Sequence, residues 1–143
     1  MRVVLDTNVL VSRFLVPNGK SAHIIHYWET GFFQLLVSKP IREECRGVLN
    51  RGRIRRRYSY TDEELDRYVT SLGVQAVTVE PGIKLQVVYA DPDDNAIVEC
   101  AVAGSADFII SGDAHLQDLG NYSGIPILSP AVFLLLLAQE EET

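Results

Sequence analysis

The sequence predicts an α/β protein in which a parallel sheet of about five strands is covered by helices on both faces. Two observations lead to this prediction. Short apolar runs rich in β-branched residues alternate with longer stretches of helical periodicity, and no sign of a tight hairpin separates two of the runs. Strands that alternate with helices are joined by right-handed crossovers, which make the strands parallel and cover both faces of the sheet.

The length and composition indicate one globular domain. We expect a single domain over residues 1–138 and a frayed acidic tail at 139–143, because 143 residues suffice for one core but are few for two. No apolar run approaches the roughly 20 residues that cross a bilayer, and the first residues lack a signal-peptide pattern, so we expect a cytoplasmic protein without a membrane span. The two cysteines, Cys45 and Cys100, each lie singly in apolar helical patterns, which favours a core role over a disulfide or a metal site.

The first third of the chain is expected to contain two strands with two helices between them. The apolar run within residues 2–6 predicts a buried strand. Helical patterns follow at 7–16 and 20–30, and Pro17-Asn18-Gly19 between them stops the first helix. A second apolar run predicts a strand at 33–37.

The middle of the chain is expected to contain two capped helices and a third strand. Residues 38–49 begin with a serine suited to cap a helix, and their apolar positions fall on one helical face. An arginine-rich stretch at 51–57 leads to a second helix over 61–73, which starts with the capping-box sequence Thr-Asp-Glu-Glu. The run at 74–79 predicts the third strand.

The last third is expected to contain two helices and two strands. Asp91-Pro92 opens a helix that ends near Gly104, with proline at the first helical position. Apolar runs at 107–111 and 125–128 predict the fourth and fifth strands. The final helix starts at Ser129-Pro130 and carries a run of leucines.

Charge is distributed unevenly along the chain. The net charge is −6, but residues 39–57 hold eight of the 13 basic residues and only two of the 19 acidic ones. This segment is therefore +6 and the remainder −12. An acidic protein with one basic stripe suits a polyanion such as a nucleic acid, while a solvated helix face and a patch for an acidic protein partner are the alternatives.

Four acidic residues lie where apolar elements begin or end: Asp6, Glu44, Asp94 and Asp113. Each alone has an ordinary explanation, since an aspartate can cap a helix or interact with its dipole and a glutamate can lie on a solvated helix face. Together they indicate a site, because Asp6 and Asp113 follow strands whose carboxyl ends share one edge of a parallel sheet. Carboxylate oxygens gathered at that edge suit Mg²⁺ or Mn²⁺.

Four motifs taken together resemble the PIN domain. They are Asp6-Thr7-Asn8 after the first strand, Glu44 before Val48-Leu49, the run Asp94-Asn95-Ala96-Ile97-Val98-Glu99-Cys100-Ala101, and Ser111-Gly112-Asp113. Their order and spacing carry the resemblance, which extends from Arg2 to about Phe133 and is closest to the bacterial group described as toxins of toxin–antitoxin systems. It implies a PIN-like three-layer α/β/α fold with a central parallel sheet of about five strands.

The resemblance also implies a metal-dependent endoribonuclease. One or two ions of Mg²⁺ or Mn²⁺ would be held by the expected catalytic residues, Asp6, Glu44, Asp94 and Asp113. Among these, Glu44 would bind either directly or through water. The adjacent acids Glu43 and Asp93 leave the choice of ligand open by one position in each case.

Further residues and partners follow from the same resemblance. Asn8 and Ser111 would orient the carboxylates or contact phosphate. Contacts to the RNA backbone are expected from Arg42, Arg46, Arg53, Arg55, Arg56 and Arg57. The expected partners are an RNA substrate, a cognate antitoxin and a second copy of the chain, in a homo-oligomer such as a dimer.

Other functions have weaker support in the sequence. A metal-free ribonuclease would need paired histidines, and only His23, His26 and His115 are present. A phosphotransfer enzyme would need an acid where Asn8 stands, and a receiver domain a lysine after a late strand. A PIN-fold protein could also act in RNA processing, or bind partners through the final helix or the helix around Trp28, without a toxin role.

Overall fold

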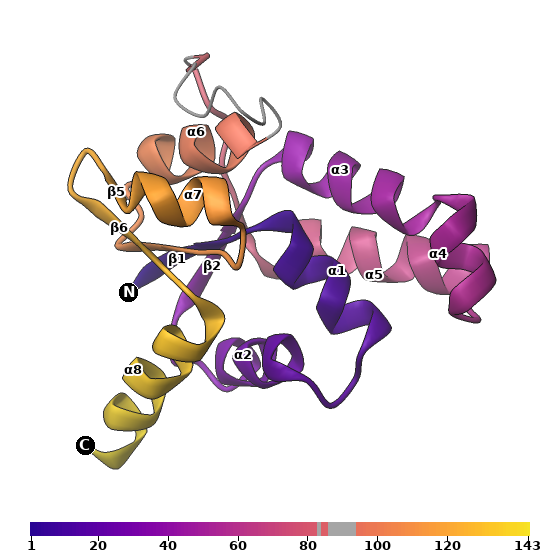
Figure 1. The fold of residues 1–143 in the computed structure, drawn as a ribbon, viewed down its shortest axis with the longest axis horizontal. Coiled ribbons are helices and arrows are strands. Elements are labelled where there is room, and N and C mark those ends of the chain that lie inside the picture. Colours follow the sequence, from indigo (N-terminus) through magenta and orange to yellow (C-terminus); the bar gives the residue numbers. More distant parts are fainter. Residues whose placement is uncertain (83, 86–93) are drawn as a thin grey trace.

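The structure, a computed structural model, describes residues 1–82, 84–85 and 94–143 (Figure 1). Its elements in chain order are β1 (Arg2–Leu5), α1 (Thr7–Leu15), α2 (Lys20–Glu29), β2 (Gln34–Val37), α3 (Lys39–Leu49), α4 (Gly52–Arg57), α5 (Asp62–Gln75), β3 (Val77–Thr78), α6 (Asn95–Ala103), β4 (Phe108–Ile110), α7 (Ala114–Leu119), β5 (Asn121–Tyr122), β6 (Ile125–Leu128) and α8 (Pro130–Glu142). The expected helix start at Asp91-Pro92 and the alternative ligand Asp93 lie outside the described residues. Helix α6 is described from Asn95, with Asp94 as its N-cap.

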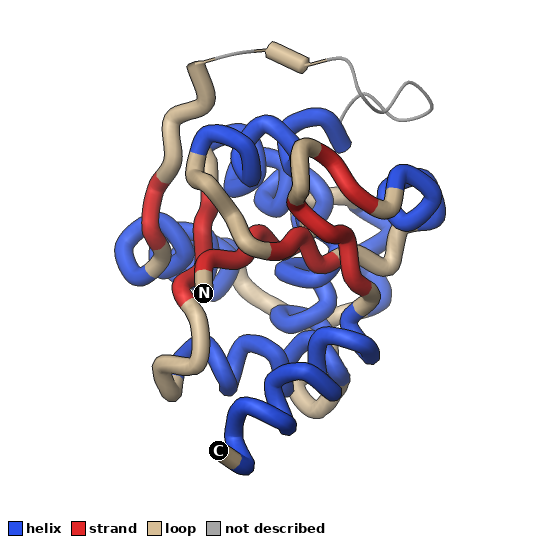
Figure 2. The backbone as a smooth tube through the Cα atoms, turned by 90° about the vertical axis from the view of Figure 1, so that its left-hand side faces the viewer, coloured by secondary structure: helices blue, strands red, loops and turns tan. Residues whose placement is uncertain are grey.

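Six strands form one central sheet in the order β3-β2-β1-β4-β6-β5. All neighbouring strands run parallel except β5 and β6. Helices lie on both sides of the sheet (Figure 1, Figure 2). The predicted α/β class and its three-layer arrangement are therefore confirmed, with one strand more than expected.

Apolar side chains fill the space between the sheet and the helices. Val3, Val4 and Leu5 of β1 are all buried, as expected for a central parallel strand with helices over both of its faces. Cys45 and Cys100 are free and buried, and burial raises the pKa of each thiol to about 12, which agrees with a core role. No helix in the described part of the chain has the length and apolar character needed to cross a lipid bilayer.

The expectation that the chain has no tight hairpin is wrong. Strands β5 and β6 are antiparallel, and Tyr122 pairs with Ile125 across a two-residue loop. The loop residues, Ser123 and Gly124, have φ of 53° and 82°. A two-residue loop with positive φ at both positions matches the right-handed twist of the strands that it joins. The Ser-Gly pair in the sequence was the available signal for this turn. The hairpin was missed because the flanking strand β5 is too short to show an apolar periodicity.

Two short helices were also not predicted. Helix α4 occupies the arginine-rich stretch, and α7 follows Asp113. Each has only six residues, so neither displays a full apolar period. Such short helices depend on tertiary contacts and caps, because a helix of this length is unstable by itself in water.

The boundary between α5 and β3 lies two residues later than predicted. Helix α5 continues through Gly73 to Gln75, and β3 covers only Val77 and Thr78. Gly73 does not end the helix but allows a close approach, since a Cβ atom there would lie 2.8 Å from Nη1 of Arg42 on α3. The glycine is thus explained by helix packing and not by a helix C-cap.

The acidic tail at 139–143, which the sequence predicts to be frayed, lies almost entirely in the last helix. Helix α8 continues to Glu142 and packs against α2. The Tyr27 hydroxyl on α2 donates to Oε2 of Glu141 at 2.6 Å. The tail is therefore helical and is connected to the domain, although its side chains are exposed.

Candidate functional site

The candidate site lies where the order of the strands reverses. From β1 the chain continues to β2 and β3 on one side, whereas β4 and β6 lie on the other. Leu5 of β1 pairs with Ile110 of β4, and the backbone N–H of Asp6 donates to the carbonyl of Ile110 at 2.9 Å. This register places Asp6 beside Ser111 at the carboxyl ends of two adjacent parallel strands. In open α/β sheets, ligands bind at such a reversal point.

Ser111 connects the two strand ends through its side chain. Its hydroxyl is buried and donates to Oδ2 of Asp6 at 2.7 Å. The same oxygen accepts the backbone N–H of Asp113 at 2.9 Å. Gln117 donates from Nε2 to the Ser111 carbonyl at 2.9 Å and so fixes the end of β4 from helix α7. Ser111 therefore sets the position of the Asp6 carboxylate.

Asp113 lies at the beginning of α7 and acts as its N-cap. Its Oδ1 accepts the backbone N–H groups of His115 at 2.8 Å and Leu116 at 3.2 Å. The ordinary capping role considered from the sequence is thus present. It orients the carboxylate next to Asp6 and is compatible with a second role in ligand binding.

The electrostatics of Asp6 indicate a place for a cation. Burial is the main cause that raises the pKa of Asp6, and the negative charge of Asp113 raises it further. The hydrogen bond from Ser111 acts in the opposite direction, as do the backbone N–H groups of Thr7 and Asn8. Two nearby carboxylates, one of them buried, therefore repel each other, and a bound cation would relieve this repulsion.

Glu44 reaches the same region from helix α3. Thr7, a buried residue at the start of α1, donates from Oγ1 to Oε2 of Glu44 at 3.1 Å. The neighbouring Glu43 instead lies on the exposed side of α3, where it pairs with Lys39 at 3.8 Å. Of the two candidates, Glu44 is the one that faces the end of β1.

Asp94 is buried at the N-terminus of α6, with 7% of its surface exposed. Helix α6 packs against β1, β4 and α3. It leads into β4 and runs in the opposite direction to the parallel strands, so its N-terminus lies toward their carboxyl ends.

The donors at this edge are chemically suited to a hard divalent ion. All four acidic side chains offer oxygen, which Mg²⁺ and Mn²⁺ prefer. Within the described residues, however, no group of three or more His, Cys, Asp or Glu side chains is arranged so that it could hold a metal ion. The structure places Asp113 near Asp6 and directs Glu44 toward Thr7, but the part of the chain that it describes does not bring three carboxylates to one point.

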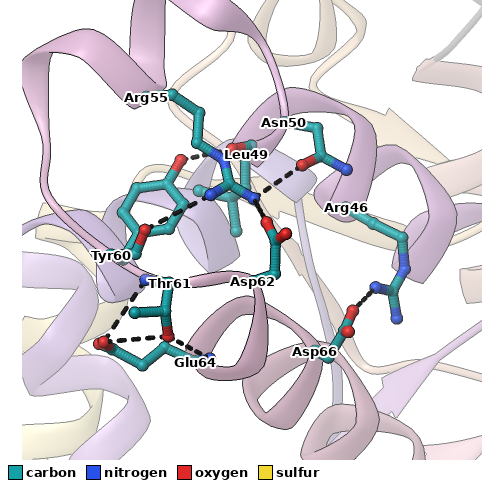
Figure 3. Close-up of polar contacts among 9 residues, drawn as sticks. All are labelled: Arg46, Leu49, Asn50, Arg55, Tyr60, Thr61, Asp62, Glu64 and Asp66. Atoms are coloured by element: carbon teal, nitrogen blue, oxygen red, sulfur yellow. Dashed lines mark hydrogen bonds and ion pairs between the residues drawn. The ribbon is translucent and has the colours of Figure 1, made fainter.

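The predicted RNA-binding arginines fall into different environments. Arg46 forms an ion pair with Asp66 on α5 (Figure 3). The guanidinium of Arg42 lies against Gly73. Positions two apart on a helix are rotated by about 200°, so Arg42 and Arg46 lie on the opposite side of α3 from Glu44. The remaining arginines, Arg53, Arg55, Arg56 and Arg57, are on α4.

Two residues of the site were overlooked in the sequence. Thr7 and Gln117 make the contacts described above. The predicted residue Asn8 has an exposed side chain, and its backbone N–H acts on the Asp6 carboxylate. The position of Thr7 directly after Asp6, at the end of a buried strand, was the available signal. The first helical residue after such a strand is itself buried. Nothing in the sequence pattern indicated Gln117.

Comparisons with known proteins agree with this architecture. A family model described as PIN domain matches residues 2–115. No curated protein matches the chain. The structure of VapBC2 from Rickettsia felis, bound to a promoter DNA fragment, has a TM-score of 0.61 at 12% identity and covers 90% of this chain and 98% of that one. VapBC-1 from nontypeable Haemophilus influenzae has a TM-score of 0.59 at 17% identity, with 92% and 99% coverage. FitAcB from Neisseria gonorrhoeae has a TM-score of 0.56 at 16% identity, with 90% and 98% coverage. At these identities the likeness establishes the fold.

Proposed function

Because this chain belongs to the PIN domain family, we propose that it is a divalent-metal-dependent endoribonuclease and the toxin of a toxin–antitoxin pair. The observation that carries the proposal is the buried Asp6 carboxylate beside Asp113, held by Ser111 at the reversal point of the sheet. A buried acid whose charge is disfavoured by its surroundings, in a place where ligands bind, is a feature of functional sites.

The proposed ligands of Mg²⁺ or Mn²⁺, as one ion or two, are Asp6, Asp94 and Asp113, with Glu44 bound directly or through water. The ion would lower the pKa of a bound water and neutralise charge on the scissile phosphate. Ser111 and Thr7 hold Asp6 and Glu44 through the bonds described above, so that the carboxylates reach the ion with little loss of side-chain freedom. Because these carboxylates repel one another, ion binding should also stabilise the folded protein.

The proposed partners follow from the family and from the structural neighbours. Two of those neighbours are VapBC complexes, which supports a cognate antitoxin as a partner of this chain. We further propose RNA as the substrate, a homodimer as the assembly and the cytoplasm as the location. A PIN-fold protein that acts in RNA processing, or only binds partners, is the alternative.

The deciding experiment measures cleavage of a mixed RNA pool with Mg²⁺ or Mn²⁺ and with EDTA. Asp6→Asn is compared with Asp118→Asn, which removes an exposed carboxylate from α7. We expect Asp6→Asn to lower the rate by more than about 100-fold, beyond the 10- to 100-fold typical of losing a group that only supports a ligand. Asp118→Asn should keep the rate of the unmodified protein.

A second pair of variants tests the assignment on α3. Glu44→Gln should slow cleavage and weaken stabilisation by the metal, while Glu43→Gln should change neither, since Glu43 pairs with Lys39 on the exposed face. Cleavage that survives EDTA and Asp6→Asn would refute the metal-dependent mechanism. Complete inactivity of a folded protein, with binding of a partner, would favour the alternative without catalysis.

A further inference from the structure

The arginines on and next to α4 are sorted into two groups by their contacts. Five arginines occur within seven consecutive positions: Arg51, Arg53, Arg55, Arg56 and Arg57. Helix α4 has no fully buried residue, so contacts made by its polar side chains must help to hold it against the domain.

Arg55 is the arginine that is turned toward the protein (Figure 3). Its Nη2 donates to Oδ1 of Asp62 at 2.5 Å and to Oδ1 of Asn50 at 2.9 Å. The guanidinium also lies 4.9 Å from the ring centre of Tyr60, whose hydroxyl donates to the carbonyl of Leu49. These contacts join α4 to the end of α3 and the start of α5.

The other four arginines are exposed. In the described residues none of them forms an ion pair. The nearby acid Asp62 pairs with Arg55, and Glu64 completes the capping box with Thr61. Arg53 and Arg57 are four residues apart on one helix, where like charges destabilise each other. A protein of net charge −6 thus keeps an unneutralised positive surface on a small helix.

The chemistry of this surface favours a polyanion over a protein partner. No large apolar side chain of α4 is exposed, and Ile54 packs against the core. Protein interfaces usually contain an apolar centre, whereas phosphate recognition uses arginine forks at an exposed surface. Helix α4 also follows directly after α3, which carries Glu44. From Glu44 to Leu49, the last residue of α3, the helix rises about 8 Å at 1.5 Å per residue, and two further residues lead to α4.

We propose that Arg51, Arg53, Arg56 and Arg57 bind the phosphate backbone of single-stranded RNA a few nucleotides from the cleaved bond, and that Arg55 is a positioning residue that holds α4 for this contact. The inference rests on the proposed function and specifies how the substrate is held. It follows that oligonucleotides too short to extend from the carboxylates to α4 are poor substrates.

Binding is tested separately from cleavage. The affinity of a fluorescent 12-nucleotide oligouridylate is measured by anisotropy in EDTA, on an Asp6→Asn background, over a range of salt concentrations. Arg53→Ala with Arg56→Ala should weaken binding several-fold and reduce the slope of log K against log salt by about 1.4, for two lost phosphate contacts on a single strand. Lys20→Ala with Arg67→Ala removes the same charge from exposed positions elsewhere and should leave the slope unchanged.

Arg55→Lys tests the positioning role, because it keeps the charge but not the planar guanidinium, whose Nη2 donates to Asp62 and Asn50 while Nη1 donates to the Tyr60 carbonyl. We expect weaker RNA binding at unchanged net charge, and an affinity equal to that of the unmodified protein would overturn this role. An unaltered salt slope in the double arginine variant would overturn the proposal even if the protein cleaves RNA. Tighter binding to a poly-glutamate peptide than to RNA would assign the surface to an acidic protein and also overturn it. Binding through α4 without any cleavage would support this inference and count against the proposed enzyme alone.

Discussion

Replacing Ser111 with alanine should cost more stability than the loss of a single hydroxyl ordinarily does. The Ser111 oxygen serves two partners at once, since it donates to the buried Asp6 carboxylate at 2.7 Å and accepts from the partly buried Asp113 N–H at 2.9 Å. A hydrogen bond to a charged group contributes about 1.5–3 kcal/mol and a neutral one about 1 kcal/mol. The expected loss is therefore about 3 kcal/mol in the free energy of unfolding.

The loss can be measured by urea and thermal unfolding in EDTA. For a chain of this size, each kcal/mol lowers Tm by roughly 2–4 °C, so the variant should melt about 10 °C lower. Ser71→Ala is a matched control, because the Ser71 hydroxyl bonds only to the Tyr68 carbonyl one turn earlier on the same helix. We expect the control to change stability by less than about 1 kcal/mol.

A double-mutant cycle separates the contact with Asp6 from the rest. Asp6→Asn is combined with Ser111→Ala, and the non-additive part reports the coupling between the two side chains. We expect a coupling of about 1 kcal/mol or more, because asparagine retains shape but not charge. Equal losses for Ser111→Ala and Ser71→Ala, or strict additivity in the cycle, would refute the claim that Ser111 holds the Asp6 carboxylate.

Three further predictions concern the same fold. Because burial raises the pKa of Asp6 above 3.8, the stabilising contribution of this residue is present below pH 3.8 and is lost as the pH rises through its folded-state pKa. Urea midpoints in EDTA should therefore fall with rising pH more for the unmodified protein than for Asp6→Asn. Parallel curves for the two proteins would contradict this prediction. Gly104→Ala should lower the free energy of unfolding by about 1–3 kcal/mol, since the added Cβ would lie 2.7 Å from Cδ1 of Leu36 and 3.1 Å from the Cys100 carbonyl. An unchanged urea midpoint would show that the neighbouring core residues move to accommodate the Cβ atom. Arg55→Ala should lower the free energy of unfolding by about 1–2 kcal/mol. Arg53 forms no ion pair in the described residues, so Arg53→Ala should change it by less than about 0.5 kcal/mol in the same assay.

The elements that were predicted well depend on local chemistry. The apolar run of β1 identifies a central strand because such a strand is buried on both faces. Ser38 accepts the N–H of Ile41, and Thr61 forms the expected capping box with Glu64, since caps involve residues only three apart. The placement of acids after β1 and β4 follows from the same local information once the strands are parallel.

The sequence by itself determined the α/β class, the order of most strands and helices, and a set of acids at one end of the sheet. It could not determine which of two adjacent glutamates faces β1, since that depends on the rotation of α3 against α1. It likewise could not assign Gly73 to helix packing or separate Arg55 from the exposed arginines of α4. These features are decided only when distant segments pack together, because the contacts that fix them join residues that share no local pattern.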